Sequence, residues 1–218
     1  MRTIRVTGKG QLRLRPDTTR ITMTLEGLYK EYGETLRRSS GDTEELQRVV
    51  SGFGFERSDL KTLQFSVDTE YESYRDKNND WKQRFAGYRF RHTLKLEFPS
   101  DNERLGKLLY ALANCAVKPE FRLSYTVSDP EAAKIMLLAK AVSDAKEKAA
   151  VLAQSGGVKL LDIQSIDYSW GEIDFEVRPM ERVMMDAAPA MAKGSYDLDI
   201  EPDDIDVSDT VTVVWEIG

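Results

Sequence analysis

Residues 88–98 read YRFRHTLKLEF and alternate between one set of Tyr, Phe, His and Leu and another of Arg, Thr, Lys and Glu. Residues 62–71, TLQFSVDTEY, alternate in a similar way. Successive side chains of a β-strand point to opposite faces of its sheet, so each stretch predicts a strand with one apolar face. The polar residues 72–86 join the two stretches, and we interpret them as the loop of an antiparallel pair.

This alternation also assigns side chains to the two faces of the predicted sheet. Phe65, His92 and Leu94 fall on the apolar face, so we expect all three in the core. Charged side chains fall on the opposite face, where we expect exposed cross-strand pairs. These charged residues are Arg89, Arg91 and Lys95 with Glu26, Asp68 and Glu70.

The N-terminal part of the chain continues the pattern. Residues 3–28 alternate and predict a long hairpin that turns at residues 16–18. Gly8-Lys9-Gly10 interrupts the first strand of this hairpin and indicates a β-bulge. Apolar residues at helical spacing then predict a helix over residues 32–52.

Two capping sequences predict the remaining helices. Ser100-Asp101-Asn102-Glu103 precedes a Leu-rich segment, which predicts a short helix. Ser128-Asp129-Pro130-Glu131 opens an Ala-rich helix that ends near Ser155, before two glycines. Further strands are predicted over residues 121–127, 159–169 and 211–217, and a long loop over residues 170–204.

The predicted order of elements is ββα-ββ-α-β-α-β-loop-β. Strands with one apolar face, and helices able to cover that face, give an α+β fold: a two-layer sandwich of antiparallel sheets with alternating helices. We expect either a single domain over residues 1–218 or two closely joined subdomains. The subdomains would comprise residues 1–85 with 205–218, and residues 86–169.

The composition excludes several classes of protein. The 218 residues carry a net charge of −6 at pH 7, with the acidic excess in the second half of the chain, which argues against nucleic-acid binding. One cysteine and one histidine exclude an intrachain disulfide and a zinc finger. No apolar run is long enough for a membrane span. The start of the sequence has no signal-peptide pattern, so we expect a cytoplasmic protein, or an envelope protein if a signal was removed.

Few residues indicate catalysis or cofactor binding. Gly8-Lys9-Gly10 lacks the Gly-Lys-Ser/Thr ending of a phosphate loop. His92 is the only histidine available as a general base, but its place on the apolar face favours a core residue. Cys115 follows a Leu-rich helix between alanines, which favours a small buried side chain over a redox group. We therefore expect no catalytic residue, no cofactor and no metal.

An acidic tract near the end of the chain keeps a second interpretation open. Seven carboxylates lie between Asp197 and Asp209, and such a set suits a hard cation such as calcium. The tract lacks the glycine and glutamate positions of an EF-hand loop, and a solvated acidic loop explains it without a ligand.

Aromatic and sulfur-containing side chains indicate an interaction surface. Tyr74, Trp81 and Phe85 lie among arginines and lysines in the predicted loop 72–86, a mixture typical of protein interfaces. Base stacking on nucleic acid would use the same residue types, but the acids in this segment nearly cancel its positive charge. Met184 and Met185 in the predicted loop 170–204 suggest an adaptable contact surface.

Several short motifs, taken in order along nearly the whole chain, resemble one family. They are Ile4-x-Val6-Thr7-Gly8-x-Gly10 with Pro16-Asp17; Gly54-Phe55 with Asp59-Leu60-Lys61-Thr62; Gly87-Tyr88; and Ser128-Asp129 with Lys148-Ala149 and Leu152-Ala153. The family is the SIMPL-domain family, a domain of unknown function found in bacterial cytoplasmic and envelope proteins. The Gly-Glu turn usual in that family before the last strand is replaced here by Glu201-Pro202-Asp203-Asp204.

The resemblance implies a fold and a tendency to self-associate, and it implies no catalytic residues. We therefore expect a non-catalytic protein that acts by self-assembly or by binding a protein partner, with a homo-oligomer as its form. The alternative is a hydrolase that uses carboxylates in a cleft beneath the predicted loop 170–204.

Overall fold

The computed structural model describes residues 2–168, 173–178, 191–192, 195–196 and 200–218. It combines helices with antiparallel sheets, which confirms the predicted α+β class. The described chain divides into two compact units. The first unit comprises Met1–Asp17, Tyr125–Val177 and Pro202–Gly218, and the second comprises Thr18–Ser124 and Arg178–Glu201.

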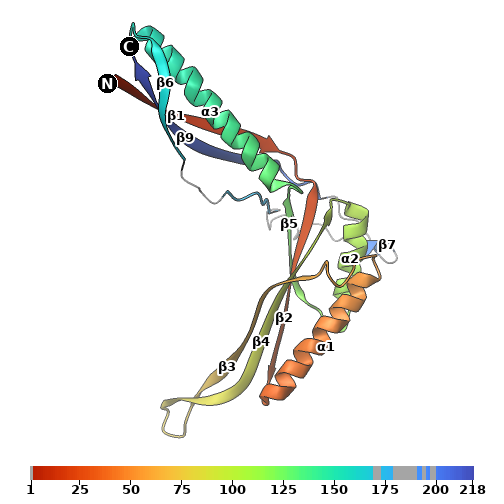
Figure 1. The fold of residues 1–218 in the computed structure, drawn as a ribbon. Helices are drawn as coiled ribbons and strands as arrows, with labels where there is room; N and C mark the ends of the chain where they lie inside the picture. Colours follow the sequence, from red (N-terminus) through yellow and green to blue (C-terminus); the bar gives the residue numbers. More distant parts are fainter. Residues whose placement is uncertain (1, 169–172, 179–190, 193–194, 197–199) are drawn as a thin grey trace. The chain divides into compact units, whose positions relative to one another are not determined.

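The first unit is a sheet with a long helix on one face (Figure 1). Its three antiparallel strands follow the order β1 (Arg2–Leu14), β9 (Ile205–Ile217) and β6 (Leu160–Asp167). Helix α3 (Pro130–Ser155) packs mainly on β1 and β9. The edge strand β6 is therefore covered least by the helix.

Helix α3 begins and ends at residues suited to those positions. The side chain of Asp129 accepts a hydrogen bond from the backbone N–H of Ala132 at 2.8 Å, and Pro130 occupies the first helical position. Gly156 and Gly157 follow the last helical residue, and Gly157 has a positive φ of 66°. Both limits agree with the sequence prediction.

Small residues let α3 lie close to β1. Every fourth residue of the helix from position 133 to position 153 is buried, and all but Leu137 in this row are alanine. A Cβ atom added to Gly8 would lie within 3.0 Å of backbone atoms of Ala141 and Ala145. Glycine on the strand and alanine on the helix therefore set the distance between the two layers.

The predicted bulge at Gly8-Lys9-Gly10 is wrong. Strand β1 pairs with β9 without a register shift, from Arg2 opposite Ile217 to Leu14 opposite Ile205. The glycines allow α3 to pack close to β1, and they do not change the strand register. A sequence pattern within one strand cannot reveal this contact with a distant helix.

Helix α3 also supplies hydrogen-bond partners to the outer edge of β1. The backbone N–H of Lys9 donates to Oδ2 of Asp144 at 2.6 Å, and Nζ of Lys140 donates to the carbonyl of Gln11 at 3.3 Å. These contacts occupy main-chain groups that an added strand would need.

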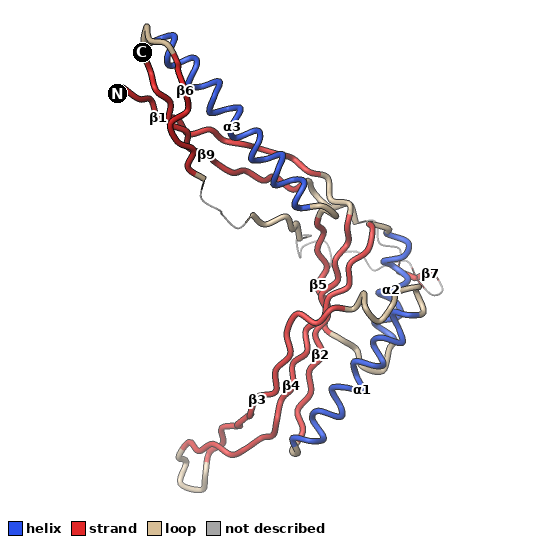
Figure 2. The backbone as a smooth tube through the Cα atoms, in the orientation of Figure 1, coloured by secondary structure: helices blue, strands red, loops and turns tan. Residues whose placement is uncertain are grey.

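The second unit contains a four-stranded antiparallel sheet in the order β3-β4-β2-β5 (Figures 1 and 2). The strands are β2 (Thr18–Tyr29), β3 (Lys61–Arg75), β4 (Trp81–Pro99) and β5 (Glu120–Thr126). Helices α1 (Tyr32–Ser51) and α2 (Asn102–Asn114) pack on one face of this sheet. Two short strands, β7 (Met191–Ala192) and β8 (Ser195–Tyr196), pair with each other.

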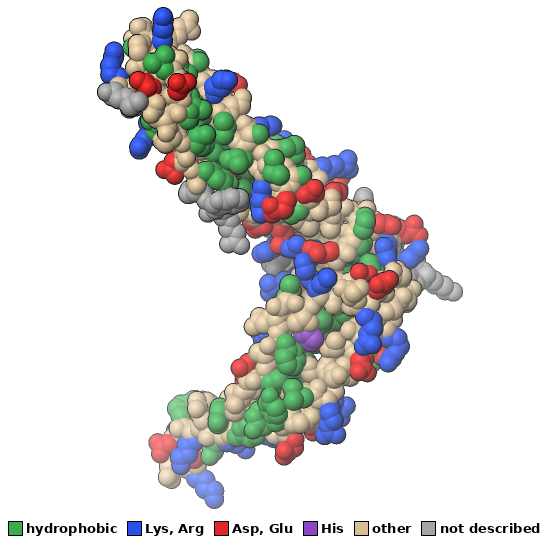
Figure 3. All heavy atoms as spheres, in the orientation of Figure 1, with side chains coloured by type: hydrophobic (Ala, Val, Ile, Leu, Met, Phe, Trp, Pro, Cys, Tyr) green, Lys and Arg blue, Asp and Glu red, His purple; other side chains and the backbone are tan. Residues whose placement is uncertain are grey.

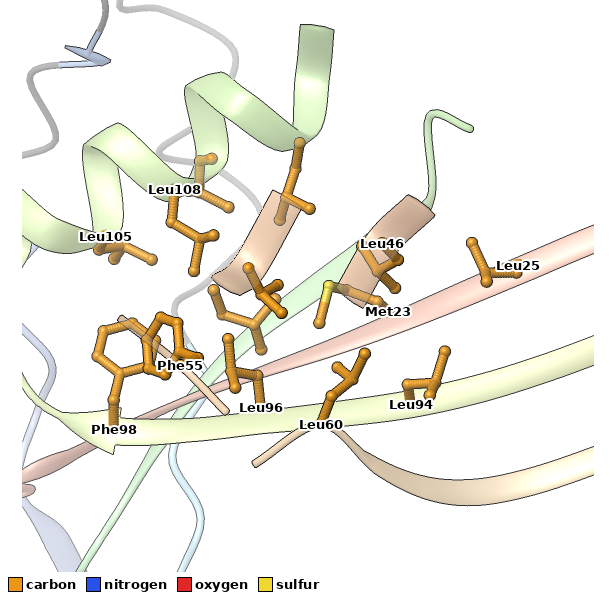
Figure 4. Close-up of a cluster of buried hydrophobic side chains, with 14 of the residues drawn as sticks. Met23, Leu25, Leu46, Phe55, Leu60, Leu94, Leu96, Phe98, Leu105 and Leu108 are labelled. Atoms are coloured by element: carbon orange, nitrogen blue, oxygen red, sulfur yellow. The ribbon is translucent and has the colours of Figure 1, made fainter. Parts of the chain in front are cut away.

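The core of the second unit lies between the sheet and its two helices. Figure 4 shows Leu105 and Leu108 of α2 above Phe55, Leu96 and Phe98. Leu46 of α1 lies beside Met23 in the same view, and this cluster continues to Leu25, Leu60 and Leu94. Burial of these side chains fixes the helices on the face that alternation predicted to be apolar.

The predicted hairpin over residues 3–28 is wrong. Strand β1 pairs with β9 in the first unit, whereas β2 pairs with β4 in the second. Alternation shows which face of a strand is apolar but does not identify its neighbours. The pairing of β3 with β4 also joins residues that the predicted subdomains separated at positions 85 and 86.

The predicted loop over residues 72–86 is wrong in extent. Strands β3 and β4 remain paired to Arg75 opposite Trp81, and only residues 76–80 form the turn (Figure 2). This end of the hairpin is exposed, so its sequence does not need the alternation that marks a half-buried strand.

Phe65 was predicted to be a core residue, and this is also wrong. Its side chain shares a face with buried His92 but is 47% exposed, because β3 is the edge strand and α1 packs mainly on β2 and β4. Leu94, which is 1% exposed, is confirmed as a core residue.

We predict that Leu94→Ala lowers the free energy of unfolding by about 2–5 kcal/mol, because it leaves a cavity in the packed core. Phe65→Ala should cost under about 1 kcal/mol, since much of that ring is already in water. Urea denaturation followed by circular dichroism measures both values. Equal losses in the two variants would contradict the burial seen here.

We further predict that Gly8→Ala lowers the free energy of unfolding by about 1–3 kcal/mol, because its methyl group would push α3 away from β1. The control is Gly41→Ala within α1, where an added Cβ meets nothing within 4 Å. That change should stabilise by up to about 1 kcal/mol through helix propensity. A neutral Gly8→Ala variant would show that the close approach of α3 is not required.

Candidate interaction surface

The end of the β3–β4 hairpin carries aromatic side chains on the face that bears the helices. In the pairing of the two strands, Tyr71 lies opposite Phe85 and Arg75 lies opposite Trp81. Trp81 is 68% exposed, Tyr71 is 57% exposed, and Phe85 is also exposed. We call Phe65, Tyr71, Trp81 and Phe85 the hairpin aromatic face.

Ring contacts connect much of this face to helix α1. Tyr71 meets Phe85 with 6.1 Å between ring centroids, and Phe85 meets Tyr88 at 5.2 Å. Tyr88 in turn packs edge-on against Tyr32 of α1 at 5.3 Å. Edge-to-face pairs at these distances are favourable, so the exposed rings are held in place.

Trp81 is held by a different contact. The guanidinium of Arg75 lies 4.9 Å from the centre of the Trp81 ring system, a cation–π geometry. The indole therefore has a stacked partner on one side, although most of its surface remains in contact with solvent.

The hairpin aromatic face is exposed because the helices cover only part of the sheet. Helix α1 contacts β2 and β4, and in Figure 1 the tip of the β3–β4 hairpin lies away from α1. Figure 3 shows hydrophobic side chains gathered in a strip beside His92. Exposed hydrophobic side chains of β3 include Leu63, Phe65 and Tyr71.

The predicted interaction residues do not form one surface. Trp81 and Phe85 lie on the face that bears the helices, whereas Tyr74 lies on the opposite face, where Arg84 stacks 5.5 Å from its ring centre. Met184 and Met185 lie outside the described residues. Sequence reasoning missed Tyr71, because it counted this residue as part of an ordinary half-buried strand.

The opposite face of the sheet carries the expected cross-strand ion pairs. Arg91 binds Glu26 at 2.7 Å, and Arg89 lies between Glu26 at 3.7 Å and Glu70 at 3.1 Å. Arg84 binds Glu72 at 2.6 Å nearer the hairpin turn. Because these pairs are exposed, each contributes less than about 1 kcal/mol to stability.

His92 lies in the core beside the hairpin aromatic face and is 8% exposed, as predicted. Thr43 Oγ1 donates to the carbonyl of Ser39 at 2.8 Å, so it accepts the hydrogen bond from Nδ1 of His92 at 3.0 Å. Nε2 then accepts from the hydroxyl of Thr62 at 2.9 Å. This network assigns the proton of the neutral ring to Nδ1.

A hollow of about 320 Å³ lies over this histidine. Its lining includes Ser40, Gln47 and Arg57, with Leu36 and Phe65 as apolar contacts. Both ring nitrogens of His92 already have partners, so the neutral imidazole has no free nitrogen for a substrate. The arrangement indicates a satisfied core histidine and not a general base.

Two carboxylates of the acidic tract engage other side chains of the described chain. Arg13 forms a hydrogen bond with Asp206 and lowers its pKa, while Asp209 accepts a hydrogen bond from Tyr168 at 2.8 Å. Asp197 and Asp199 lie outside the described part of the chain. No group of three or more His, Cys, Asp or Glu among the described residues is arranged to hold a metal ion.

The structure also bears on the predictions made for Cys115 and for a membrane span. Cys115 is buried and its thiol donates to the carbonyl of Leu112 at 3.1 Å, so it is a packed residue at the end of α2. None of the described helices combines the length and the apolar character needed to cross a membrane.

The pKa of His92 is lowered by burial, and this makes stability depend on pH. The unfolded chain takes up the proton near pH 6.5, before the folded protein does, so the free energy of unfolding should fall as pH drops below this value. An NMR titration of the single histidine should give a midpoint below 6.5. His92→Gln should remove this part of the pH dependence, and a midpoint at or above 6.5 would contradict the burial effect.

Comparisons with known proteins place the whole fold in one family. The family model SIMPL, described as "Protein of unknown function (DUF541)", matches residues 4–215. No curated protein matches the chain. Because the match spans both units and nearly all of the sequence, the chain belongs to the SIMPL family.

Proposed function

We propose that this protein acts by binding protein surfaces, and that copies of the chain associate through the hairpin aromatic face. The observation that carries the proposal is the exposure of Trp81 and Tyr71 at the end of a hairpin whose strands stay paired to Arg75 and Trp81. Aromatic side chains and arginine are enriched at protein interfaces, and both occur here in contact with each other.

The apolar area that these rings leave in water can drive association. Covering such area stabilises a complex by roughly 25 cal/mol per Å² before the costs of association are subtracted. Trp and Tyr supply large areas per residue and are the residues most often found to dominate binding. Tyr71 and Phe85 are exposed and in contact with each other, so they provide the centre of the proposed binding surface.

The arrangement of the rings reduces the cost of binding. The contacts from Tyr71 through Phe85 and Tyr88 to Tyr32 hold the side chains in position before a partner arrives. A preorganised surface loses less side-chain entropy on association than a mobile one. Homo-oligomers with closed symmetry are the commonest way for a soluble chain to cover such a face.

Sedimentation of the purified chain tests this proposal. The parent should exceed the monomer mass of 24.8 kDa at tens of micromolar. The triple variant Tyr71→Ser, Trp81→Ser, Phe85→Ser should sediment as a monomer and keep its circular dichroism spectrum, because its rings lie outside the core. A parent that is monomeric at this concentration, or a variant that unfolds, would overturn the proposal.

A matched control removes three exposed apolar side chains elsewhere. Tyr74 lies on the opposite face of the hairpin, and Ile135 and Val151 are exposed on α3. The variant Tyr74→Ser, Ile135→Ser, Val151→Ser should keep the parent's mass. Equal dissociation of both variants would show that the hairpin aromatic face is not the specific contact.

A further inference from the structure

Strand β3 presents a long open edge. It is the last strand of its sheet, and it has 15 residues. No described strand pairs with its outer side, and no described group outside β4 makes a hydrogen bond to its backbone. Every second residue of such a strand directs its N–H and C=O away from the sheet. This edge can therefore accept another strand.

Among the described edge strands, β1 is partly blocked by α3, whereas the outer edge of β3 is open. On β1, Asp144 and Lys140 of α3 occupy the N–H of Lys9 and the carbonyl of Gln11. Folded proteins commonly block exposed edges with such devices, because open edges pair with other chains. The pairing of β3 with β4 shifts register between Thr62 and Gln64 and between Glu70 and Tyr71, but no described backbone group hydrogen-bonds to the outer edge of β3, which leaves that edge open to strand addition.

Charges on the polar face of the sheet alternate in sign from strand to strand. Glu26 on β2 meets Arg89 and Arg91 on β4, and Arg89 meets Glu70 on β3. As the edge strand, β3 therefore presents acidic residues on the polar face of the sheet, and these include Glu72 and the exposed Asp68. A strand added beside β3 would continue this alternation of charge only if it carried lysine or arginine on the polar face, since opposite charges across strands attract.

The other face of β3 sets a second requirement. Phe65, Val67 and Tyr71 lie on the face that bears the helices, and the rings of Phe65 and Tyr71 are exposed. A strand added beside them would place every second side chain against this apolar row. The edge therefore matches a segment in which apolar residues alternate with basic ones.

Among the described strands, neither β1 nor β3 offers a segment of alternating apolar and basic residues that is free to pair with β3. Two copies of β3 would bring Asp68, Glu70 and Glu72 together, and like charges across strands repel. Strand β1 has the right alternation, with Arg5 and Lys9 on one face, but its apolar face is packed beneath α3 and its edge is engaged. The edge thus disfavours self-pairing.

We infer that the outer edge of β3 binds an extended segment of another protein in which apolar residues alternate with lysine or arginine. The segment adds to the sheet as a fifth strand, with its apolar side chains along the hairpin aromatic face and its cations beside Asp68, Glu70 and Glu72. This inference rests on the proposed interaction function, and it identifies the chemistry of a partner other than a second copy.

Binding of synthetic peptides to the full chain tests the inference. The probe is a nine-residue peptide of alternating lysine and valine that carries a fluorescent label. Its binding is measured by fluorescence anisotropy. It should bind at least about tenfold more tightly than a peptide with the same residues grouped as five lysines and four valines, because only alternation satisfies both faces. A peptide of alternating glutamate and valine should bind no more tightly than the grouped one.

Charge reversal on the edge provides the decisive comparison. The variant Asp68→Lys, Glu72→Lys should lose binding of the lysine peptide and gain binding of the glutamate peptide. The control Glu131→Lys, Glu147→Lys on α3 makes the same change in net charge and should behave as the parent. Hydrogen exchange should show new protection of β3 amides when the lysine peptide is bound.

Several results would overturn the inference. These are equal binding of grouped and alternating peptides, an equal effect of the α3 control, and binding without protection of β3 amides. If no peptide binds to the chain at a concentration where sedimentation shows a monomer, while the parent but not the triple aromatic variant associates at tens of micromolar, strand addition fails and the proposed function stands. If the peptide binds as expected to a chain that is monomeric, strand addition stands and self-association fails.

Discussion

Strand β4 is the element on which the second unit depends, because its 19 residues pair with β2 on one side and with β3 on the other. Its buried half supplies Phe90, Leu94 and Leu96 to the core under the helices. Its other half continues beyond them, paired only with β3, to Trp81. One strand thus belongs both to a packed core and to an exposed ribbon, and the exposed part carries Trp81 and Phe85, for which we propose a binding role.

In the first unit, the main constraint is the close packing of α3 on β1. A helix can lie close to a sheet only where the facing side chains are small, and the row of alanines on α3 meets Gly8 and Gly10 on β1. The same closeness brings Asp144 and Lys140 within reach of the edge of β1. Packing and edge protection therefore have one cause in this unit. In the second unit α1 packs mainly on β2 and β4, so many side chains of β3 are left exposed.

The proposed binding role rests on the surfaces of the second unit. The only histidine is buried and has hydrogen-bond partners on both nitrogens, while Arg89 and Arg91 are engaged in cross-strand ion pairs. What remains exposed is a row of aromatic rings next to an open, acidic strand edge. The SIMPL family is described as a protein of unknown function, so membership assigns no activity to these surfaces.

The sequence by itself determined the α+β class, most helix limits and the core position of His92 and Leu94, because these follow from local capping and from the alternation of side chains. It also identified Trp81 and Phe85 as interaction residues, a role that stays a prediction. Only the tertiary structure decided that β1 pairs with β9 instead of β2, and that Phe65 is exposed at an edge. Strand partners and helix coverage depend on contacts between residues far apart in the chain, such as Asp17 with Ser128, and a local pattern carries no information about them.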